Sequence, residues 1–435
     1  MPTTPSLLTL GCCLSWLEGG LWSDVADKLQ GSLTLGTYHH FQDAVQEHGD
    51  TRIEAKLELE FDGKLGERVR YHFTPRAYVN NMDWATGVVD QEPETQQNRF
   101  ILDAGEAYVR YSADSFDLSL GRQIYRWNVA DVPYNPTDNN LPMDFMDSLN
   151  LQKMGVFSGS LQYSSENVSL TLLAIPWFTP SRIPGDNSRW QGDFGDAPST
   201  FMGYDLAVGS RGLPDWNPGN AGAYGFHLAS STLLNGWDLA LNFYDGLDPV
   251  GVLRGDIAGR NVVLHQDFPR FRETGISYST TWSNVEFHGE AGFHDTVDNE
   301  KDDDYLEYVV GANFTYYSVP FTEETFIVLE YADEQLVQRK SATSRYSGSG
   351  DYVRPFKGTW IASVNFKFDE DNSLKLSGLR NQADLDGLWR ADFSHKFNDV
   401  LKVNVGVDFL DGSSSSFFGR WRDNDRIFMN WTLFI

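Results

Sequence analysis

The sequence predicts an all-β protein, a transmembrane antiparallel β-barrel of about 18 strands, with 16 as the alternative count. Three observations lead to this fold class. Apolar and ionic side chains alternate along much of the chain, and the turn-like segments between them are alternately short and long. No apolar run reaches the roughly 18 to 20 residues that a membrane-spanning helix requires. Aromatic residues make up 14% of the chain and glycine contributes 39 residues, a composition that favours strands and tight turns.

The first 27 residues are expected to precede the barrel. Residues 5–17 are mostly apolar and are typical of the core of a secretory signal peptide, although no Lys or Arg precedes them. A short disordered or plugging N-terminus is the alternative. The two cysteines, Cys12 and Cys13, are adjacent, so a disulfide framework is excluded. Residues 28–435 are therefore predicted to form a single barrel domain.

The alternation has a period of two, as in a β-strand. Within residues 52–62, Ile53, Leu57 and Leu59 share one face, and glutamates and a lysine occupy the other. The same division recurs in residues 401–410. A soluble sandwich would bury the apolar faces and need linkers between domains, and the sequence has no such linker. We therefore expect the apolar faces to contact lipid and the ionic faces to line a lumen.

The positions of the connections define the strands. Short connections are expected on the periplasmic side and long loops on the extracellular side, as in outer-membrane barrels. The final residues are apolar at every second position up to Ile435, which suits a last barrel strand. The predicted strands are residues 28–41, 52–62, 67–79, 99–112, 116–127, 157–163, 168–176, 222–233, 237–245, 273–282, 285–293, 306–317, 324–333, 358–368, 373–381, 386–397, 401–410 and 426–435. Aromatic residues expected to form girdles at strand ends are Tyr108, Tyr111, Trp127, Tyr163, Trp282, Tyr316, Tyr317, Trp360, Phe397 and Trp431.

The charge balance and the motifs limit the function. The chain carries 61 acidic and 34 basic side chains, a net charge of −27, which argues against nucleic acid as a partner. No metal-binding, nucleophile or phosphate-loop motif is present, so we expect neither an enzyme nor a cofactor. One constellation that a barrel hydrolase could use remains, His288 and His294 near Glu290 and Asp295.

A candidate pore constriction begins on the strand at residues 99–112. Alternation places Glu106, Tyr108 and Arg110 on its inward face. On the next strand the same parity would turn Arg122 toward lipid, at a cost of up to a few kcal/mol near the midplane. A β-bulge at Gly121 is therefore predicted to return Arg122 and Arg126 to the lumen.

The segment that follows, residues 128–156, departs from the strand pattern. Its three prolines and its Asn-Pro and Asp-Asn steps favour turns. We expect this loop to fold into the barrel and narrow it. Asp131, Asp138 and Asp144 would then face the three arginines at the narrowest point and set the ion preference. The same pairs could instead anchor the loop to the wall, and both roles can hold together.

A second ionic row is expected on the lumen wall. Arg68, Arg70 and Arg76 face Glu54 and Glu58 on the preceding strand. Cross-strand charge pairs of this kind contribute roughly 0.2 to 1 kcal/mol each. Reinforcement of the wall is the favoured interpretation, and a ladder that guides anions is the alternative.

Two parts of the sequence resemble a known family. The first resembles the passage from strand to constriction loop in Gram-negative porins; it consists of Leu118–Trp127 leading into Asn135–Asp138, together with Glu106–Arg110. The other, Phe418–Ile427, is similar to the last loop and strand of large porin-like outer-membrane proteins. The resemblance implies a location in the outer membrane, contact with its lipid and lipopolysaccharide, and passive, charge-selective passage of small solutes or ions. It names no substrate. The alternative it allows is a non-catalytic sheath or scaffold for a periplasmic protein partner, such as a multihaem cytochrome in an electron conduit.

Overall fold

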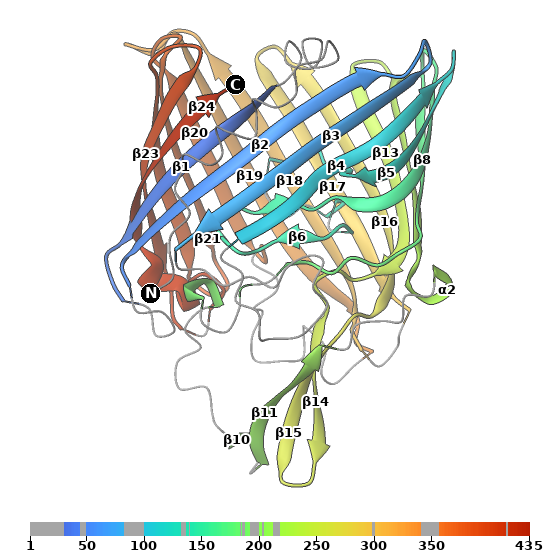
Figure 1. The fold of residues 1–435 in the computed structure, drawn as a ribbon, viewed down its shortest axis with the longest axis vertical. Coiled ribbons are helices and arrows are strands. Elements are labelled where there is room, and N and C mark those ends of the chain that lie inside the picture. Colours follow the sequence, from blue (N-terminus) through green and yellow to red (C-terminus); the bar gives the residue numbers. More distant parts are fainter. Residues whose placement is uncertain are drawn as a thin grey trace, which may run out of the picture.

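The wall of the molecule is one continuous antiparallel sheet of 18 strands that closes on itself (Figure 1). Closure is made by the first and last strands, which pair from Ser32↔Phe434 to His40↔Arg426. The computed structural model describes residues 30–43, 49–81, 100–131, 136–138, 140–182, 184, 188–191, 200–201, 204–211, 218–297, 301–340, 356–414 and 416–435. The expected signal peptide therefore lies outside the described residues.

All 18 predicted strands are present, with ends shifted by a few residues. In order around the wall they are β1 (Gln30–His40), β2 (Thr51–Lys64), β3 (Val69–Asn80), β4 (Phe100–Ser112), β5 (Phe116–Gln123), β8 (Val156–Ser164), β9 (Ser169–Ile175), β12 (Ala223–Leu234), β13 (Trp237–Leu247), β16 (Arg270–Trp282), β17 (Val285–Thr296), β18 (Asp304–Tyr316), β19 (Glu324–Gln338), β20 (Thr359–Lys367), β21 (Asn372–Asn381), β22 (Gly387–Lys396), β23 (Leu401–Asp411) and β24 (Arg426–Phe434).

Short and long connections alternate as predicted. The strand pairs β4/β5, β12/β13 and β16/β17 are joined by two or three residues at the end of the barrel where β1 begins and β24 ends. The long connections all lie at the opposite end. We call these the short-turn end and the long-loop end.

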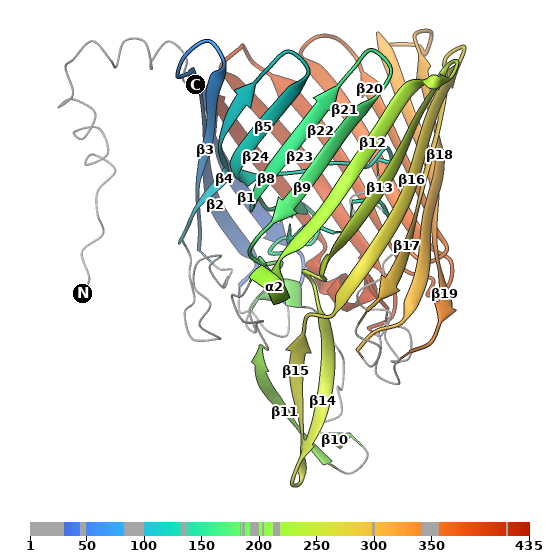
Figure 2. The same ribbon diagram turned by 90° about the vertical axis from the view of Figure 1, so that its right-hand side faces the viewer.

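Six shorter strands lie outside the wall sheet and were not predicted. β6 (Met143–Asp144) and β7 (Gln152–Lys153) form a hairpin within the predicted inward loop. β10 (Thr200–Phe201), β11 (Tyr204–Arg211), β14 (Val252–Ala258) and β15 (Asn261–Asp267) form a separate sheet that projects beyond the long-loop end (Figure 2). The strands of this sheet lie in two long polar loops and pair with each other, not with the wall. The alternation of apolar and ionic residues that predicted the wall strands therefore could not predict them.

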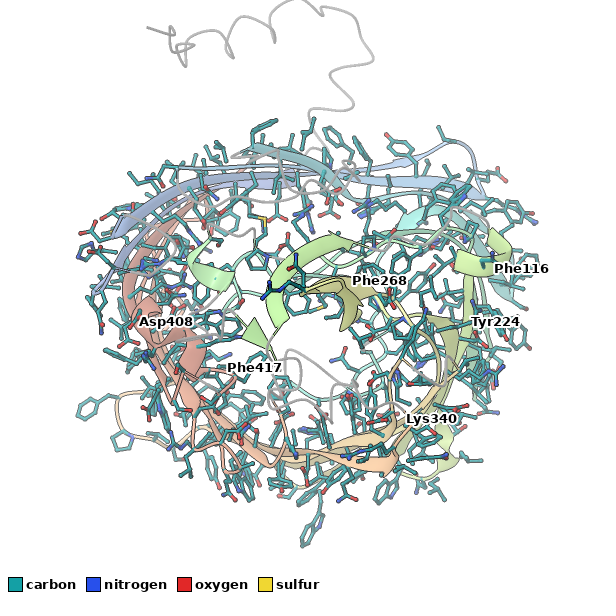
Figure 3. The ribbon with its side chains drawn as sticks, turned by 90° about the horizontal axis from the view of Figure 1, so that it is seen from below. Phe116, Tyr224, Phe268, Lys340, Asp408 and Phe417 are labelled. Atoms are coloured by element: carbon teal, nitrogen blue, oxygen red, sulfur yellow. The ribbon has the colours of Figure 1, made fainter. Side chains whose placement is uncertain are left out.

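The outer face of the wall is apolar. Leu102, Leu120 and Ile276 are 69%, 58% and 59% exposed, although each lies within a strand of the wall. Seen along the barrel axis, Phe116 and Tyr224 lie on the outer side of the wall (Figure 3). Inward positions are polar, and Ser158, His288 and Asp408 are fully buried. This is the reverse of a soluble sandwich and matches a barrel whose surroundings are apolar.

The aromatic girdle is confirmed in part. Tyr163, Trp282 and Tyr317 are exposed on the outer face near strand ends. Tyr108 and Trp127 instead face the interior, where Trp127 stacks on His227 at 5.7 Å. No helix in the described part of the chain is both long and apolar enough to cross a membrane.

Candidate functional site: a loop across the barrel lumen

The connection between β5 and β8, residues 124–155, crosses the interior of the barrel. We call it the third loop, since it is the third connection at the long-loop end. On one wall the Asp131 backbone N–H donates to Glu330 of β19 at 2.8 Å, and the Thr137 hydroxyl donates to Glu290 of β17. On the opposite wall the third loop meets β2, β22 and β24. Its contacts with both walls divide the lumen.

The local fold of the third loop follows from its own polar residues. β5 ends at Gln123, four residues earlier than predicted, because the Ile124 N–H donates to Glu106 and the Trp127 N–H donates to Asp138. Lys153 then pairs with Asp138 and donates to two backbone carbonyls. Burial raises the pKa of Asp138 and lowers that of Lys153, and the pairing of the two groups opposes both shifts.

A pair of glycines on the wall receives the third loop. Gly275 of β16 and Gly292 of β17 are cross-strand partners on the inward face. A Cβ atom on Gly292 would lie 2.4 Å from the Pro136 carbonyl oxygen, and one on Gly275 would lie 2.8 Å from the Thr137 side chain. Side chains at these two positions would exclude the loop, so the glycine pair forms the notch in which it sits.

Next to the notch, a third glycine permits a buried hydrogen bond across a strand. His288 of β17 bonds Glu330 of β19 at 2.8 Å, and Gly311 of β18 lies between them. A Cβ on Gly311 would approach His288 Nε2 to 2.6 Å. The hydrogen bond fixes Glu330 where it accepts the Asp131 N–H.

The opposite wall holds the third loop through an ionic network. Asp147 pairs with Arg52 of β2 at 2.9 Å and with Arg426 of β24 at 3.0 Å. Arg426 also pairs with Asp408 of β23, which in turn binds Arg390 of β22. Burial alone would raise the pKa of Asp147, but the guanidinium groups of Arg426 and Arg52 outweigh it and hold that pKa far below its usual range. Breaking a buried ion pair of this geometry by removing one partner strongly destabilises the folded protein.

A group of three arginines surrounds one carboxylate beside the third loop. Arg122 of β5 lies 3.1 Å from Asp103 of β4, and Arg182, from the loop between β9 and β12, lies 3.7 Å from the same side chain. Arg182 also pairs with Asp144 of the third loop. Arg76 of β3 is the cross-strand partner of Asp103, and it pairs with Glu58 at 2.9 Å. We call Arg76, Arg122 and Arg182 the arginine cluster.

The arginine cluster keeps unused donors. Arg182 is 7% exposed, and its Nε and Nη2 have no hydrogen-bond acceptor among the described residues; the same holds for the buried Nε of Arg122. Glycines provide the space for these long side chains, since a Cβ on Gly155 would lie 2.9 Å from Arg122 Cγ. A small anion could therefore accept hydrogen bonds here that the protein itself does not satisfy.

The orientation predicted for Arg122 agrees with the structure, but the predicted bulge does not. The β4–β5 ladder runs without a register shift from Ala107↔Arg122 to Ser112↔Asp117. Gly121 instead adopts φ +134°, a conformation that side-chain-bearing residues rarely adopt. That conformation turns Arg122 inward to Asp103 without an extra residue.

None of the ion pairs among the described residues joins Arg110, Arg122 or Arg126 to the aspartates of the third loop that were expected to face them. Arg110 lies two residues from the short-turn end of β4 and bonds Ser119 and Tyr108. Asp138 pairs with Lys153 and Asp144 with Arg182, because the β6–β7 hairpin and the β9–β12 loop deliver those cations. Asp131 is exposed and meets the wall through its backbone. Arg126 is exposed and forms none of the ion pairs found among the described residues; it lies close enough to Asp138 to affect its pKa.

Of the pairs predicted on the lumen wall, the structure contains the one between Arg76 and Glu58. Glu54 pairs with Arg52 at 2.9 Å, and Glu58 pairs with Arg76. Arg70 has Lys64 and Arg110 as its cross-strand partners, so three cations stand side by side near the short-turn end. Arg68 is at the rim, where it donates to the outward Tyr111 at 3.4 Å. Glu106 accepts the Ile124 N–H and lies 3.8 Å from His72.

Several site residues were not identified from the sequence. Asp103, Arg52, Arg390, Asp408 and Arg426 all occupy inward positions, and alternation alone could have marked them as lumen-facing. Their pairing with the third loop could not be predicted in this way, because it depends on where the folded chain places them in three dimensions. Arg182 carried no strand signal, because it lies in a proline-containing loop.

Loop side chains also fill part of the long-loop end. Trp190 is 1% exposed and packs edge-on against Trp421, whose indole N–H donates to the Trp190 carbonyl at 2.7 Å. Ala130 of the third loop, Phe418 and Leu410 belong to the same apolar cluster. This cluster narrows the mouth of the barrel on the side of β23 and β24.

The histidines considered for hydrolysis are placed in structural roles. His288 is buried against Glu330, and His294 is stacked between Phe271 at 4.1 Å and Tyr305 at 4.3 Å. Asp295 points to the other face of β17 and pairs with Lys340. One group that could hold a metal ion exists among the described residues, the exposed Glu60 and Asp62 with the half-buried His72, but His72 already bonds Asp62 at 2.9 Å.

This architecture defines the class of fold: a closed antiparallel β-barrel of 18 strands, with an apolar exterior and a loop folded into its lumen. Among solved structures, the chain is similar to mutants of the porin of Rh. blastica. One has 12% identity and a TM-score of 0.43, and a triple mutant has 13% identity and a TM-score of 0.43; each match covers 94% of this chain and 99% of that one. A structure titled "Asymmetric conductivity of engineered proteins" matches with 12% identity and a TM-score of 0.44 over the same shares. No protein-family model and no curated protein matches the sequence.

Proposed function

We propose that the protein is an outer-membrane channel of a Gram-negative bacterium that lets small solutes or ions pass passively and selects them by charge. In this arrangement the long loops face the outside and the short turns face the periplasm. The observation that carries the proposal is the third loop, which is fixed to opposite walls and leaves the arginine cluster beside it. A charged restriction in a water-filled barrel acts on every permeating ion at close range.

The charges along the wall of β2 to β5 support a preference for anions. Lys64, Arg70 and Arg110 form a row of cations near the short-turn end. Nearer the long-loop end, Arg122 of the same wall and Arg182 of the loop between β9 and β12 keep buried N–H groups that have no hydrogen-bond acceptor among the described residues. An anion that enters from outside would meet first the cluster and then the row. The strongly acidic balance of the whole chain does not decide the preference, because charges outside the lumen are screened within about 10 Å at 0.1 M salt.

Ion selectivity in planar bilayers tests this function. Under a KCl gradient, the substitution Arg122→Glu should shift the reversal potential toward cation preference, because it places a carboxylate beside Asp103. Arg380→Glu is the matched control: Arg380 pairs with Asp411 at 3.0 Å, and both side chains are exposed on the outer face at the long-loop end. If Arg122→Glu leaves the reversal potential at the wild-type value, the selectivity assignment fails.

A closed barrel that sheathes or scaffolds a periplasmic partner is the second candidate. The aromatic cluster around Trp190 and Trp421 favours it, because this cluster closes part of the long-loop end. The two candidates predict different currents. A folded, membrane-inserted chain that conducts no ions and co-purifies with a haem protein would support the sheath.

A further inference from the structure

Three neighbouring strands bring one histidine and three carboxylates together on the lumen side of the wall. Glu60 and Asp62 lie on the inward face of β2, His72 on that of β3 and Glu106 on that of β4, and these strands run side by side (Figure 1). The four residues lie between the arginine cluster and the row of cations near the short-turn end. We call them the His72 group.

The donor atoms of the His72 group lie at distances that suit metal ligands. One ligand atom from each of Glu60, Asp62 and His72 lies within 4.8 Å of the other two. His72 Nδ1 is 2.9 Å from Asp62 Oδ1. Two ligands on a tetrahedral Zn²⁺ ion, with bonds of about 2.0 to 2.1 Å, are roughly 3.3 Å apart. An ion could therefore replace the hydrogen bond between His72 and Asp62 after small side-chain movements.

A β-bulge brings the third carboxylate to the other ring nitrogen of the histidine. The β3–β4 register shifts next to Thr74, where β4 contains one extra residue. The Thr74 hydroxyl accepts the Glu106 N–H at 2.7 Å. Glu106 Oε2 then lies 3.8 Å from His72 Nε2, and Glu106 Oε1 accepts the Ile124 N–H at 3.0 Å. Bulges re-aim side chains in this way and are common next to functional sites.

The position of Glu106 suits a histidine that binds a metal. Such a histidine usually donates its second ring N–H to a carboxylate, which fixes the tautomer and the ring orientation. With a proton on Nε2, toward Glu106, the electron pair of His72 Nδ1 is directed at Asp62. That nitrogen then needs a proton or a cation, because two electron pairs 2.9 Å apart repel each other. Tyr108 packs against the His72 ring, with 5.2 Å between ring centroids, and limits its rotation.

The charge around His72 favours a cation. None of the three carboxylates of the group forms an ion pair with a lysine or arginine within the described ranges of the chain. Glu58, one inward position further along β2, is by contrast paired with both Lys56 and Arg76. The row of cations lies one inward position nearer the short-turn end, roughly 7 Å away along each strand. Carboxylates in direct contact with an ion attract it more strongly than charges at that distance repel it.

We propose that the His72 group binds a divalent transition-metal ion of the Zn²⁺ type, with Glu60, Asp62 and His72 as ligands and Glu106 as the residue that orients His72. An imidazole nitrogen favours Zn²⁺, Cu²⁺ or Ni²⁺, whereas Ca²⁺ and Mg²⁺ prefer oxygen ligands alone. The carboxylates of Glu60 and Asp62 are exposed, so an ion can reach them from the lumen. Three protein ligands leave a further position for water.

Calorimetric titration of Zn²⁺ into the folded protein in detergent, prepared without a histidine tag, tests the site. Wild type should bind one ion tightly. Glu106→Gln should weaken binding about 10- to 100-fold, the usual loss when the carboxylate behind a ligating histidine is removed, and His72→Gln should weaken it by more than about 100-fold. His39→Gln is the matched control and should match wild type, because the nearest carboxylate to the exposed His39 is that of Asp50 alone, at 3.9 Å.

Electron paramagnetic resonance of bound Cu²⁺ separates a ligand from a residue that orients it. Wild type should show one nitrogen donor to the ion, and His72→Gln should show none. Glu106→Gln should keep the nitrogen donor at lower affinity. Asp62→Asn is a second ligand variant, with a 62% exposed side chain that the fold does not require, and it should also weaken Zn²⁺ binding.

Several results would overturn the metal site. One is equal Zn²⁺ affinity of wild type, His72→Gln and Asp62→Asn, and another is no Zn²⁺ binding by the folded wild type. Tighter binding of Ca²⁺ than of Zn²⁺ would also overturn it, because the carboxylates would then act without the histidine. Heat-modifiable mobility on gels shows whether each variant is folded. The titration needs no current, so its result is independent of whether the protein conducts ions.

Discussion

Gly275 and Gly292 face each other across β16 and β17, and the missing side chains at these two positions make the space that Pro136 and Thr137 occupy. This relationship explains how a loop without regular structure keeps a defined position in a wide barrel. The notch supplies the shape, Glu290 and Glu330 supply acceptors, and the ionic network around Asp147 fixes the far side.

Closing the notch should displace the third loop. In Gly292→Val, the new side chain would collide with the Pro136 carbonyl, a backbone atom that cannot rotate away. We expect a loss of about 1 to 3 kcal/mol in the free energy of unfolding, the usual range for overpacking. Thermal unfolding followed by heat-modifiable mobility measures it. The control is Gly159→Ala, whose Cβ would meet only the Leu120 side chain at 3.2 Å; equal stability of the two variants would show that the notch is not needed.

Asp147 should contribute more to stability than any exposed carboxylate. Asp147→Asn removes the charge that faces Arg52 and Arg426, which are 2% and 0% exposed. Because two buried cations lose a partner, we expect destabilisation of about 3 to 5 kcal/mol. Asp399→Asn, in an exposed turn where Asp399 pairs with Lys396, is the control and should change little. Urea unfolding of both variants gives the comparison, and a small effect at Asp147 would mean that the network is not needed to hold the loop.

The same carboxylate predicts how stability depends on pH. The pKa of Asp147 is depressed in the folded protein, so its stabilisation is present above the unfolded-state value of about 4. Protonation lowers the stability as the pH falls below about 4 toward the depressed folded value. Between about pH 5 and pH 3 the wild type should therefore lose more stability than Asp147→Asn. Parallel pH profiles for the two proteins would contradict this assignment.

Neighbouring residues on β5 should differ in their access to water. Leu120 is on the outer face and 58% exposed, and Asp117 is on the inward face and partly exposed. In a variant without Cys12 and Cys13, Asp117→Cys should react with a small charged thiol reagent in membranes, and Leu120→Cys should react only after detergent extraction. Reaction of Leu120→Cys in intact membranes would show that the apolar face does not contact lipid.

The strands were predictable because their signal is local. Alternation in residues 52–62 or 401–410 is visible within ten residues and does not depend on the rest of the chain. The inward faces followed directly, including those of Glu54, Glu58 and Arg76. Strand ends were less predictable where a tertiary contact decides them, as at Gln123, where Glu106 captures the next N–H.

The partners of the third loop were not predictable, because they are distant in sequence. Asp147 binds Arg52 and Arg426, which are 95 and 279 residues away. Alternation states which way a side chain points but not its height along the barrel, since strand tilt sets the height. Arg110 illustrates this: its inward direction was correctly predicted, but it lies near the short-turn end and far along β4 from the third loop.

The central claim is that water and ions pass the barrel through a space that the third loop restricts. Single-channel recording of the wild type and of Gly292→Val tests it most directly. The wild type should open in discrete steps, and Gly292→Val should show a larger unitary conductance because the loop no longer sits against β17. No steps from folded wild-type protein, or the same unitary conductance in both proteins, would contradict the claim.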